Sequence, residues 1–199
     1  MKSIQGQPVV LASSALWRSE ALTRLGIPHL AQSPHYQEPP FVGGALETHV
    51  QTLALGKAKS LAAQHPGAIL IGLDQLIEVK GQVLGKPGAH QQALAQLRLL
   101  NGQTHRLVNG LALVWGEKEQ TFFDQSELKM RSLQEAELEY YLQAETPYQC
   151  AGSYQIEGLG ASLFEQINTP DLGSIVGLPV HLLLNGLRRW GFSNLLAND

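Results

Sequence analysis

Asp74 is the residue that is hardest to explain without chemistry. It follows the apolar run 68–73 and precedes further apolar residues, which places a carboxylate on an otherwise buried strand. Burying a charge is costly unless a partner compensates for it. Asp74 is therefore either a structural residue that accepts backbone N–H groups, or a metal ligand or general base beside the cations Lys57 and Lys86.

These two lysines are candidates for binding phosphate. Lys57 falls within the apolar stripe of a helix predicted over 46–64, whereas Lys59 falls on the opposite face. An inward lysine either follows the helix until its ammonium reaches solvent, or extends the ammonium to meet an anion. Lys86 lies between a glycine that allows close approach and a proline that stiffens the turn.

A serine turn precedes a third cation. Ser13 and Ser14 connect a strand predicted over 8–12 to a helix predicted over 15–25, and we expect them to cap that helix. Such a turn presents N–H groups and hydroxyls to an anion. Arg18, in the first turn, opposes the helix dipole, which an adjacent anion would explain. Ordinary serine capping beside an exposed arginine is the alternative.

Glu38 supplies a second carboxylate on a segment that the following prolines keep extended. Mg²⁺ is usually held by one or two carboxylates together with substrate phosphates, so Glu38 and Asp74 predict a shared Mg²⁺ or Mn²⁺. With the three cations and the serine turn, this set suits a nucleoside triphosphate. The sequence has no phosphate-binding Gly-x-x-x-x-Gly-Lys-Ser/Thr motif, no paired zinc histidines on a helix, and a His105 that we expect to be structural.

Composition limits the function classes. The 199 residues carry a net charge of −3, so binding to a nucleic acid polymer through phosphate neutralisation is not expected. The single cysteine, Cys150, excludes an internal disulfide, and we expect it to be a small buried side chain in a reducing compartment. No segment is apolar over the length of a membrane span. We therefore expect a cytoplasmic protein with one domain over 1–199. A symmetric homodimer is the base-rate expectation for such a protein.

The apolar pattern alternates between strands and helices. It predicts strands over 8–12, 68–79, 82–84, 106–114 and 122–130, and helices over 15–25, 46–64, 89–100, 132–143 and 180–190. Ser132 and Glu135 form a predicted capping box for the fourth helix. Hairpins need antiparallel neighbours and crossovers favour parallel ones, so the fold class is α/β with a mixed sheet.

Read in order along the chain, these residues belong to stretches that resemble the Maf family of nucleoside triphosphate pyrophosphatases. The matching stretches cover nearly the whole chain: 11–18, Glu38, 57–58, 71–75, 85–87, 101–105, 150–158 and 176–179. The resemblance implies a two-lobed, ITPase-like fold with an elongated mixed sheet, flanking helices and a cleft between the lobes. It also implies metal-assisted hydrolysis of a nucleotide to its monophosphate and diphosphate, with Asp74 at the proposed proton acceptor.

The resulting assignment of roles is specific. We expect Ser13, Arg18, Lys57 and Lys86 to bind the phosphates, Glu38 and Asp74 to bind the metal, and Asp74 to help deprotonate a water that attacks the α-phosphorus.

Three further positions resemble the branch of the family that hydrolyses 7-methyl-GTP. These are Trp17 before Arg18, Gln75 after Asp74, and Glu157 after the Ala-Gly-Ser segment. A 7-methylated guanine is positively charged, so an indole face attracts it, and a carboxylate accepts hydrogen bonds from the guanine N1–H and amino group. The alternatives are core packing for Trp17 and a solvated loop position for Glu157.

Four residues depart from the usual family pattern: Ala15, Leu16, Ser19 and Gln37. They remove a hydroxyl, a proline, a positive charge and a carboxylate from the region of the expected triphosphate, which could weaken metal or substrate binding. Two rival functions follow. One is the same reaction on dTTP, UTP or CTP, and the other is a nucleotide-binding regulator of cell division with little catalysis.

Overall fold

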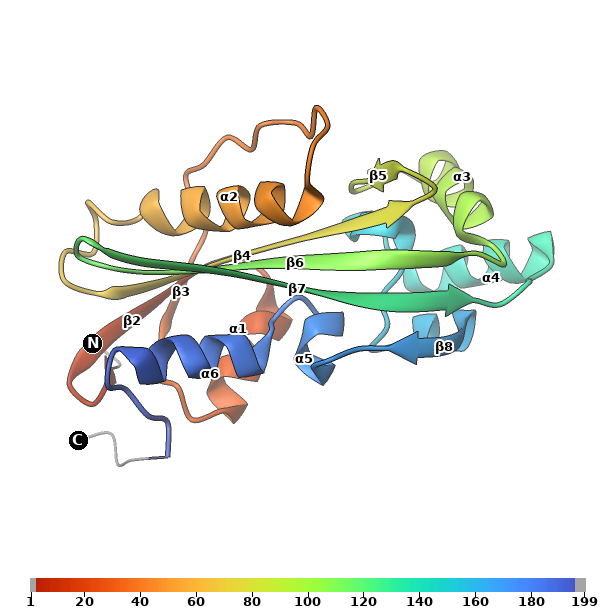
Figure 1. Cartoon of the computed structure of the whole chain (residues 1–199). Helices are drawn as coiled ribbons and strands as arrows, with labels where there is room; N and C mark the ends of the chain where they lie inside the picture. Colours follow the sequence, from red (N-terminus) through yellow and green to blue (C-terminus); the bar gives the residue numbers. More distant parts are fainter. Residues whose placement is uncertain (1–2, 196–199) are drawn as a thin grey trace. The chain divides into compact units, whose positions relative to one another are not determined.

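The computed structural model describes residues 3–195 and contains strands and helices in alternation (Figure 1). The strands are β1 Ser3–Ile4, β2 Gln7–Ala12, β3 Leu30–Gln32, β4 Ile69–Val79, β5 Gln82–Leu84, β6 Thr104–Trp115, β7 Lys118–Met130 and β8 Phe164–Asn168. The helices are α1 Leu16–Arg24, α2 Leu46–Lys59, α3 His90–Leu100, α4 Glu135–Glu145, α5 Leu172–Ile175 and α6 Val180–Arg189, with short 3₁₀ turns η1 Ala151–Ser153 and η2 Leu159–Leu163. None of the helices in this part of the chain combines the length and apolar character needed to cross a bilayer.

The strands form one mixed sheet. Its order is β1-β2-β4-β6-β7-β8, with β3 also paired to β2 and β5 paired to β4. β2 runs parallel to β3 and β4, whereas β1/β2, β4/β5 and β7/β8 are antiparallel. The predicted α/β class with a mixed sheet flanked by helices is confirmed.

The chain divides into two compact units, each assembled from separate segments. The first contains residues 3–74, 109–124 and 171–195, and the second contains 75–108 and 125–170. The strands β4, β6 and β7 contribute residues to both units. That residues 1–199 act as one domain stays a prediction.

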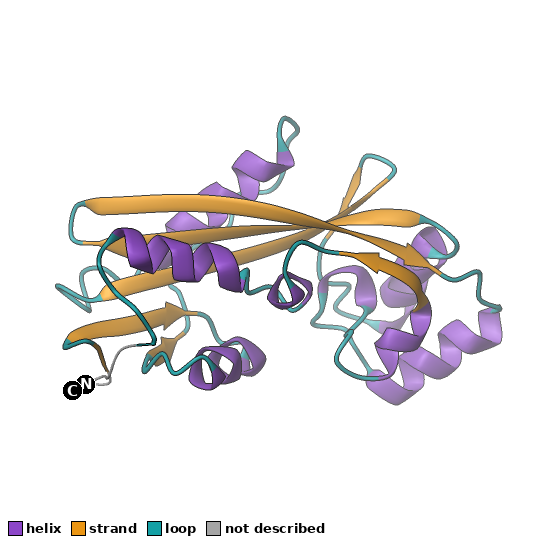
Figure 2. Ribbon diagram, turned by 60° about the horizontal axis from the view of Figure 1, so that its bottom comes forward, coloured by secondary structure: helices purple, strands orange, loops and turns teal. Residues whose placement is uncertain are grey.

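In the first unit, the sheet is covered on both faces because its strands are apolar on both sides. Val9, Leu11, Ile69, Ile71 and Leu73 pack with residues of α1 and α6 on one face. The alternate strand residues Val10, Ala12 and Leu70 pack with Ala54 and Ala58 of α2 on the other face. Figures 1 and 2 show α2 and α6 on opposite sides of the sheet. Asp74 shares strand parity with Leu70 and therefore lies on the α2 face.

In the second unit, α3 packs against α4 and η1. His105 of β6 is buried between two aromatic rings, Tyr154 and Phe164, and its Nε2 lies 3.0 Å from the Tyr154 hydroxyl. Its Nδ1 is buried without a hydrogen-bond partner among the described residues. This apolar environment lowers the pKa of His105 from 6.5 to about 4.

Several local predictions were wrong. Ala15, not a serine, occupies the N-cap of α1, because Ser13 turns its hydroxyl toward the Ala15 N–H at 3.2 Å before the helix starts. The capping box of α4 is formed by Gln134 and Glu137 instead of Ser132 and Glu135, because the N-cap lies two residues later than expected. The short elements β1, β3, β8 and α5 were not predicted. Segments of two to five residues depend on their pairing partners and packing more than on a local sequence pattern.

We expect His105 to make stability depend on pH between about pH 4 and pH 6.5. Within this window the unfolded state binds the proton and the folded state does not, so stability is complete above the window and falls as the pH drops through it. The loss amounts to about 3 kcal/mol. Urea unfolding of the parent and of His105→Gln across this range measures the effect as a difference in slope.

The exposed His35 provides the control for this experiment. His35→Gln should leave the pH slope of the parent unchanged, whereas His105→Gln should flatten it. Parallel pH profiles for the parent and His105→Gln would contradict the assignment.

Candidate active site

Lys57 joins the two predicted carboxylates. Its Nζ lies 2.5 Å from Asp74 Oδ1 and 2.8 Å from Glu38 Oε1. The side chains of Lys57 and Asp74 are 12% and 6% exposed, whereas that of Glu38 is 53% exposed. A buried ammonium paired with one buried and one exposed carboxylate forms a charged cluster at the border of the core and solvent, where a charged ligand has access.

The approach of α2 to β4 places Lys57 over Asp74. A Cβ on Gly72 would lie 2.0 Å from the Ala54 carbonyl oxygen, so only glycine lets the helix backbone come this close to the strand. Asp74 is two residues beyond Gly72 on the same strand face, and Lys57 is three residues beyond Ala54 on the same helix face. The sequence signal for this contact, an isolated glycine within an apolar strand, was overlooked.

A second glycine brings Glu38 to the cluster. The ring of Tyr36 lies on Gly56 of α2 so closely that a Cβ there would be 2.2 Å from the ring. The neighbouring His35 N–H donates to the Ser60 hydroxyl at 3.1 Å. These two anchors fix the extended segment on α2 and carry Glu38, two residues further on, to Lys57. Tyr36, Gly56 and Ser60 were not singled out from the sequence.

Arg18 lies on the α1 side of the same strand. Its Nη1 donates to the carbonyl oxygen of Leu73 at 3.4 Å, and its buried Nε has no hydrogen-bond partner among the described residues. Burial lowers the pKa of Arg18, and the charges of Asp74 and Glu38 oppose that change. A buried guanidinium N–H without an acceptor is suited to an anionic ligand.

Trp17 and Gly177 connect α1 to the segment after α5. The indole N–H of Trp17 donates to the Val176 carbonyl oxygen at 3.0 Å, which fixes the orientation of a ring that remains 42% exposed. Gly177 has φ +78°, and a Cβ there would lie 2.6 Å from Arg18 Nη2. Glycine therefore allows the positive φ of this turn and leaves room for the Arg18 guanidinium. Ser13 is buried at the end of β2.

The electrostatics of Asp74 suit a proton acceptor that is held ready by a cation. Burial raises its pKa, and Lys57 opposes this rise by charge and hydrogen bonding. Asp74 Oδ1 pairs with Lys57, but Oδ2 is buried and has no hydrogen-bond partner among the described residues. This oxygen is available to accept a proton from water or to ligate a cation.

No three His, Cys, Asp or Glu side chains gather into a metal site among residues 3–195. A divalent cation at Glu38 and Asp74 would therefore take its remaining ligands from substrate oxygens and water, which is the usual arrangement for Mg²⁺ with a nucleotide. The unpartnered Asp74 Oδ2 and the exposed Glu38 fit this donor set.

The second unit holds the other predicted residues. Lys86 and Glu157 are exposed and both act electrostatically on Cys150, since Glu157 raises and Lys86 lowers the pKa of its thiol. Burial is the largest cause of the raised Cys150 pKa, although the residue is only half-buried and not buried as expected. Gln75 follows Asp74 in β4, so its side chain projects from the opposite face of the strand.

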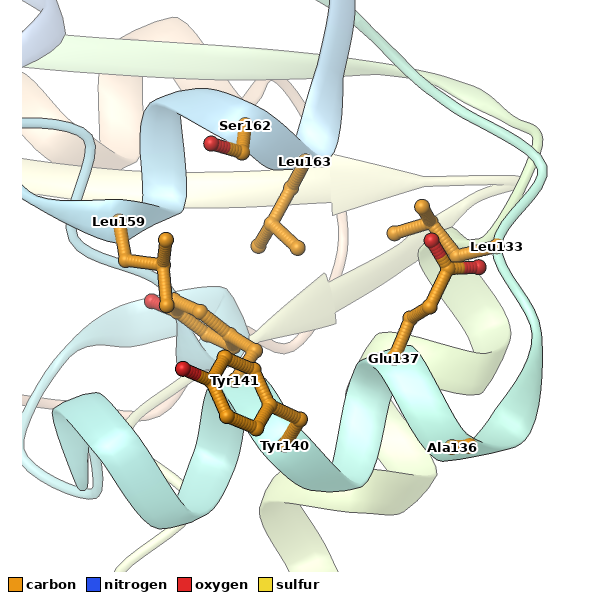
Figure 3. Close-up of a pocket in the computed structure, with 8 residues that line it drawn as sticks. All are labelled: Leu133, Ala136, Glu137, Tyr140, Tyr141, Leu159, Ser162 and Leu163. Carbon is orange, nitrogen blue, oxygen red and sulfur yellow. The ribbon is translucent and has the colours of Figure 1, made fainter.

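The turn that carries Glu157 is tied to α4. The Gln155 N–H donates to the Tyr141 hydroxyl at 2.9 Å, and the Leu159 N–H donates to Glu145 Oε1 at 2.8 Å. The same helix lines an apolar cavity of about 300 Å³ in this unit (Figure 3), which is formed by Leu133, Ala136, Glu137, Tyr140, Tyr141, Leu159, Ser162 and Leu163. The charged residues of the candidate site do not line this cavity.

Comparison with known proteins places these features in a family. The model of the family described as Maf-like protein matches residues 8–190, and the chain belongs to this family. It is 41% identical over 184 residues to a 7-methyl-GTP pyrophosphatase of Xanthomonas oryzae pv. oryzae (strain MAFF 311018), with 92% of this chain and 97% of the relative covered. A protein of the same name from Cupriavidus metallidurans is 39% identical over 194 residues (96% and 98% covered), and one from Nitrosococcus oceani is 41% identical over 187 residues (92% and 94%).

The contact at Gly72 predicts a clear asymmetry between two glycine substitutions. Gly72→Ala places a methyl group against the backbone of α2, which cannot retreat locally, and we expect a loss of about 2 kcal/mol or more in unfolding free energy. Gly56→Ala meets only the Tyr36 side chain and gains helix propensity, so its cost should stay within about 1 kcal/mol. Urea unfolding of both variants measures the difference, and equal losses would show that the helix and strand do not touch as described.

Proposed function

We propose that this chain is a nucleoside triphosphate pyrophosphatase that hydrolyses 7-methyl-GTP to 7-methyl-GMP and diphosphate. The supporting observation is the Lys57 bridge to Glu38 and Asp74, in which Asp74 Oδ2 is buried and has no hydrogen-bond partner within residues 3–195. The charges of Lys57, Glu38 and Arg18 all act on this carboxylate. The names of the relatives, similar along almost the whole chain, support the same substrate.

In the proposed reaction, Asp74 accepts a proton from the water that attacks the α-phosphorus. Oδ1 holds the Lys57 ammonium, so Oδ2 is the oxygen that receives the proton. The raised pKa of Asp74 improves its match to the pH of the cell as a general base. The water's oxygen forms a bond to phosphorus as the bond to the bridging oxygen breaks, and diphosphate leaves.

The cations neutralise the triphosphate. Arg18 presents a buried N–H that finds no acceptor in the described part of the chain, and Lys57 supplies an ammonium that is already oriented by two carboxylates. We assign Lys86 and the Ser13 turn to the remaining phosphate oxygens. Orientation of the substrate and compensation of its charge provide most of the rate enhancement in such a site.

We further propose that Glu38 and Asp74 hold a divalent cation, Mg²⁺ or Mn²⁺, with the help of substrate oxygens and water. Each carboxylate oxygen has two lone-pair sites, so Asp74 Oδ2 would face the cation with one and the attacking water with the other. Such a cation, when bound, polarises the phosphoryl oxygens and compensates the negative charge of the leaving group.

Trp17, Gln75 and Glu157 are proposed to select the base. The exposed indole face of Trp17 is held in one orientation by Val176 and suits the positive charge of 7-methylguanine. Glu157 is exposed on a turn that α4 braces on both sides, so its carboxylate can meet the N1–H and amino group of guanine. Gln75, the residue after Asp74 in the sequence, is assigned to the same selection. A cytoplasmic location and a homodimer stay predictions from the sequence.

The first test is diphosphate release from 7-methyl-GTP, GTP, dTTP, UTP and CTP in the presence of Mg²⁺ or Mn²⁺. We expect 7-methyl-GTP to have the highest kcat/KM, and Asp74→Asn to lower kcat by a factor of about 100 or more because the proton acceptor is lost. Chelation of the divalent ion should stop turnover.

Glu119→Gln is the matched control, because Glu119 of β7 pairs with Lys59 at 2.6 Å, and Lys59 lies on α2, the helix that also carries Lys57. It should retain parental activity. Preference for a pyrimidine nucleotide would refute the base assignment, and tight nucleotide binding without diphosphate release would favour a binding regulator instead.

A second test separates the two base-reading contacts. Trp17→Ala should reduce the kcat/KM ratio of 7-methyl-GTP over GTP about tenfold, because the attraction for the positive base is lost. Glu157→Gln should lower kcat/KM for both guanine nucleotides, since both carry the N1–H and amino group. Phe123→Ala removes another exposed aromatic ring and serves as the control. An unchanged ratio in Trp17→Ala would eliminate its role.

A further inference from the structure

Asp124 of β7 lies at the centre of a polar network that the proposed reaction does not use. Its Oδ1 accepts a hydrogen bond from Asn109 Nδ2 at 2.9 Å, and its Oδ2 accepts one from the Ser174 hydroxyl. Asn109 Nδ2 also donates to the Ser174 carbonyl oxygen at 2.9 Å. Asn109 and Ser174 are fully buried. The adjacent strands β6 and β7 therefore hydrogen-bond to Ser174 of α5 through both its side chain and its backbone.

The segment 171–178 that contains Ser174 is folded tightly. Asp171 caps α5 by accepting the Gly173 N–H at 2.8 Å and also accepts the His181 N–H at 2.6 Å at the start of α6. The Gly177 N–H donates to the Ser174 carbonyl oxygen at 3.1 Å, and a Cβ on Gly173 would lie 2.3 Å from the Leu178 carbonyl oxygen. Because α5 is only four residues long, these contacts, and not helix propensity, determine its shape.

Two residues of this segment, Val176 and Gly177, contact the side chains on α1 that we propose to bind the ligand. The Val176 carbonyl oxygen accepts the Trp17 indole N–H, and Gly177 provides the space that the Arg18 guanidinium fills. Ser174 is two residues before Val176 and three before Gly177. We therefore expect a change at Ser174 to shift the Val176 carbonyl oxygen, which accepts the Trp17 hydrogen bond, or the Gly177 backbone beside Arg18.

We propose that Asp124 is a positioning residue that orients Trp17 and Arg18 through Ser174 and the segment 171–178. This inference rests on the proposed function, in which Trp17 reads the base. Asp124 touches neither side chain in any contact described above, and it acts on them only through the backbone of Val176 and Gly177. Its loss should affect base selection and substrate binding more strongly than the chemical step.

Kinetics of Ser174→Ala and Asp124→Asn provide the first test. Ser174→Ala removes only the hydroxyl, so the fold should persist even if the Asp124→Asn variant is unstable. Each variant should raise KM for 7-methyl-GTP by a factor of about 5–10 with a smaller change in kcat. In a Trp17→Ala background, the same substitutions should alter the 7-methyl-GTP over GTP ratio little further, because the residue through which they act is already gone.

A second readout does not depend on catalysis. The chain contains three tryptophans, which 5-fluorotryptophan labelling resolves by ¹⁹F NMR, with the Trp17 signal assigned from Trp17→Phe. Ser174→Ala and Asp124→Asn should shift or broaden the Trp17 signal. Gln120→Ala, which removes a 3.3 Å hydrogen bond from the same strand to the Gly186 carbonyl oxygen on α6, should leave it in place.

The two readouts separate the inference from the function on which it rests. A displaced Trp17 signal together with activity on another nucleotide would support positioning by Asp124 and reject the substrate. An unmoved Trp17 signal in both variants would overturn the positioning role, whatever the enzyme hydrolyses.

Discussion

The ion pairs of Lys57 with Asp74 and Glu38 are the constraint around which the first unit is arranged. An ammonium and a carboxylate that are this deeply buried are costly to desolvate, and losing either partner would leave the other uncompensated. Replacing a buried ion pair by apolar residues of similar volume is often neutral or stabilising. Stability alone is therefore a weak explanation for this pair, and the proposed binding of substrate and cation is a stronger one.

The two ion pairs of Lys57 can form only because two positions, one on β4 and one on α2, are glycines without a Cβ atom. Gly72 lets α2 approach β4 until Lys57 reaches Asp74, and Gly56 lets Tyr36 lie on α2 until Glu38 reaches Lys57. Neither glycine carries a charge or a nucleophile, yet each determines a distance between charged atoms. Gly72 and Gly56 therefore determine the geometry of the proposed site as much as its charged residues do.

The sequence predicted the charged residues but not how they are held. Lys57 and Asp74 were identified because a charge within an apolar pattern needs a reason, and this reasoning depends only on local periodicity. The same periodicity gave the longer strands and helices and the mixed sheet. It failed at Ser13 and Ser132, where capping depends on the helix start, and at α5, where four residues are shaped by Asn109 and Asp124 from distant strands. Contacts between segments far apart in sequence leave no local pattern.

Contacts between distant segments also explain why the residues that we expect to differ from the family pattern need not abolish the proposed site. Ala15, Leu16 and Ser19 lie on or beside the first turn of α1, where Trp17 and Arg18 already have supports that come from elsewhere: the Val176 carbonyl, the Leu73 carbonyl and the space at Gly177. Ser19 instead contacts Nε2 of the buried His29 at 2.7 Å, which holds α1 to the following chain. The proposed ligand-binding residues Trp17 and Arg18 therefore depend less on the first-turn sequence of α1, because their side chains contact β4 and the segment 171–178.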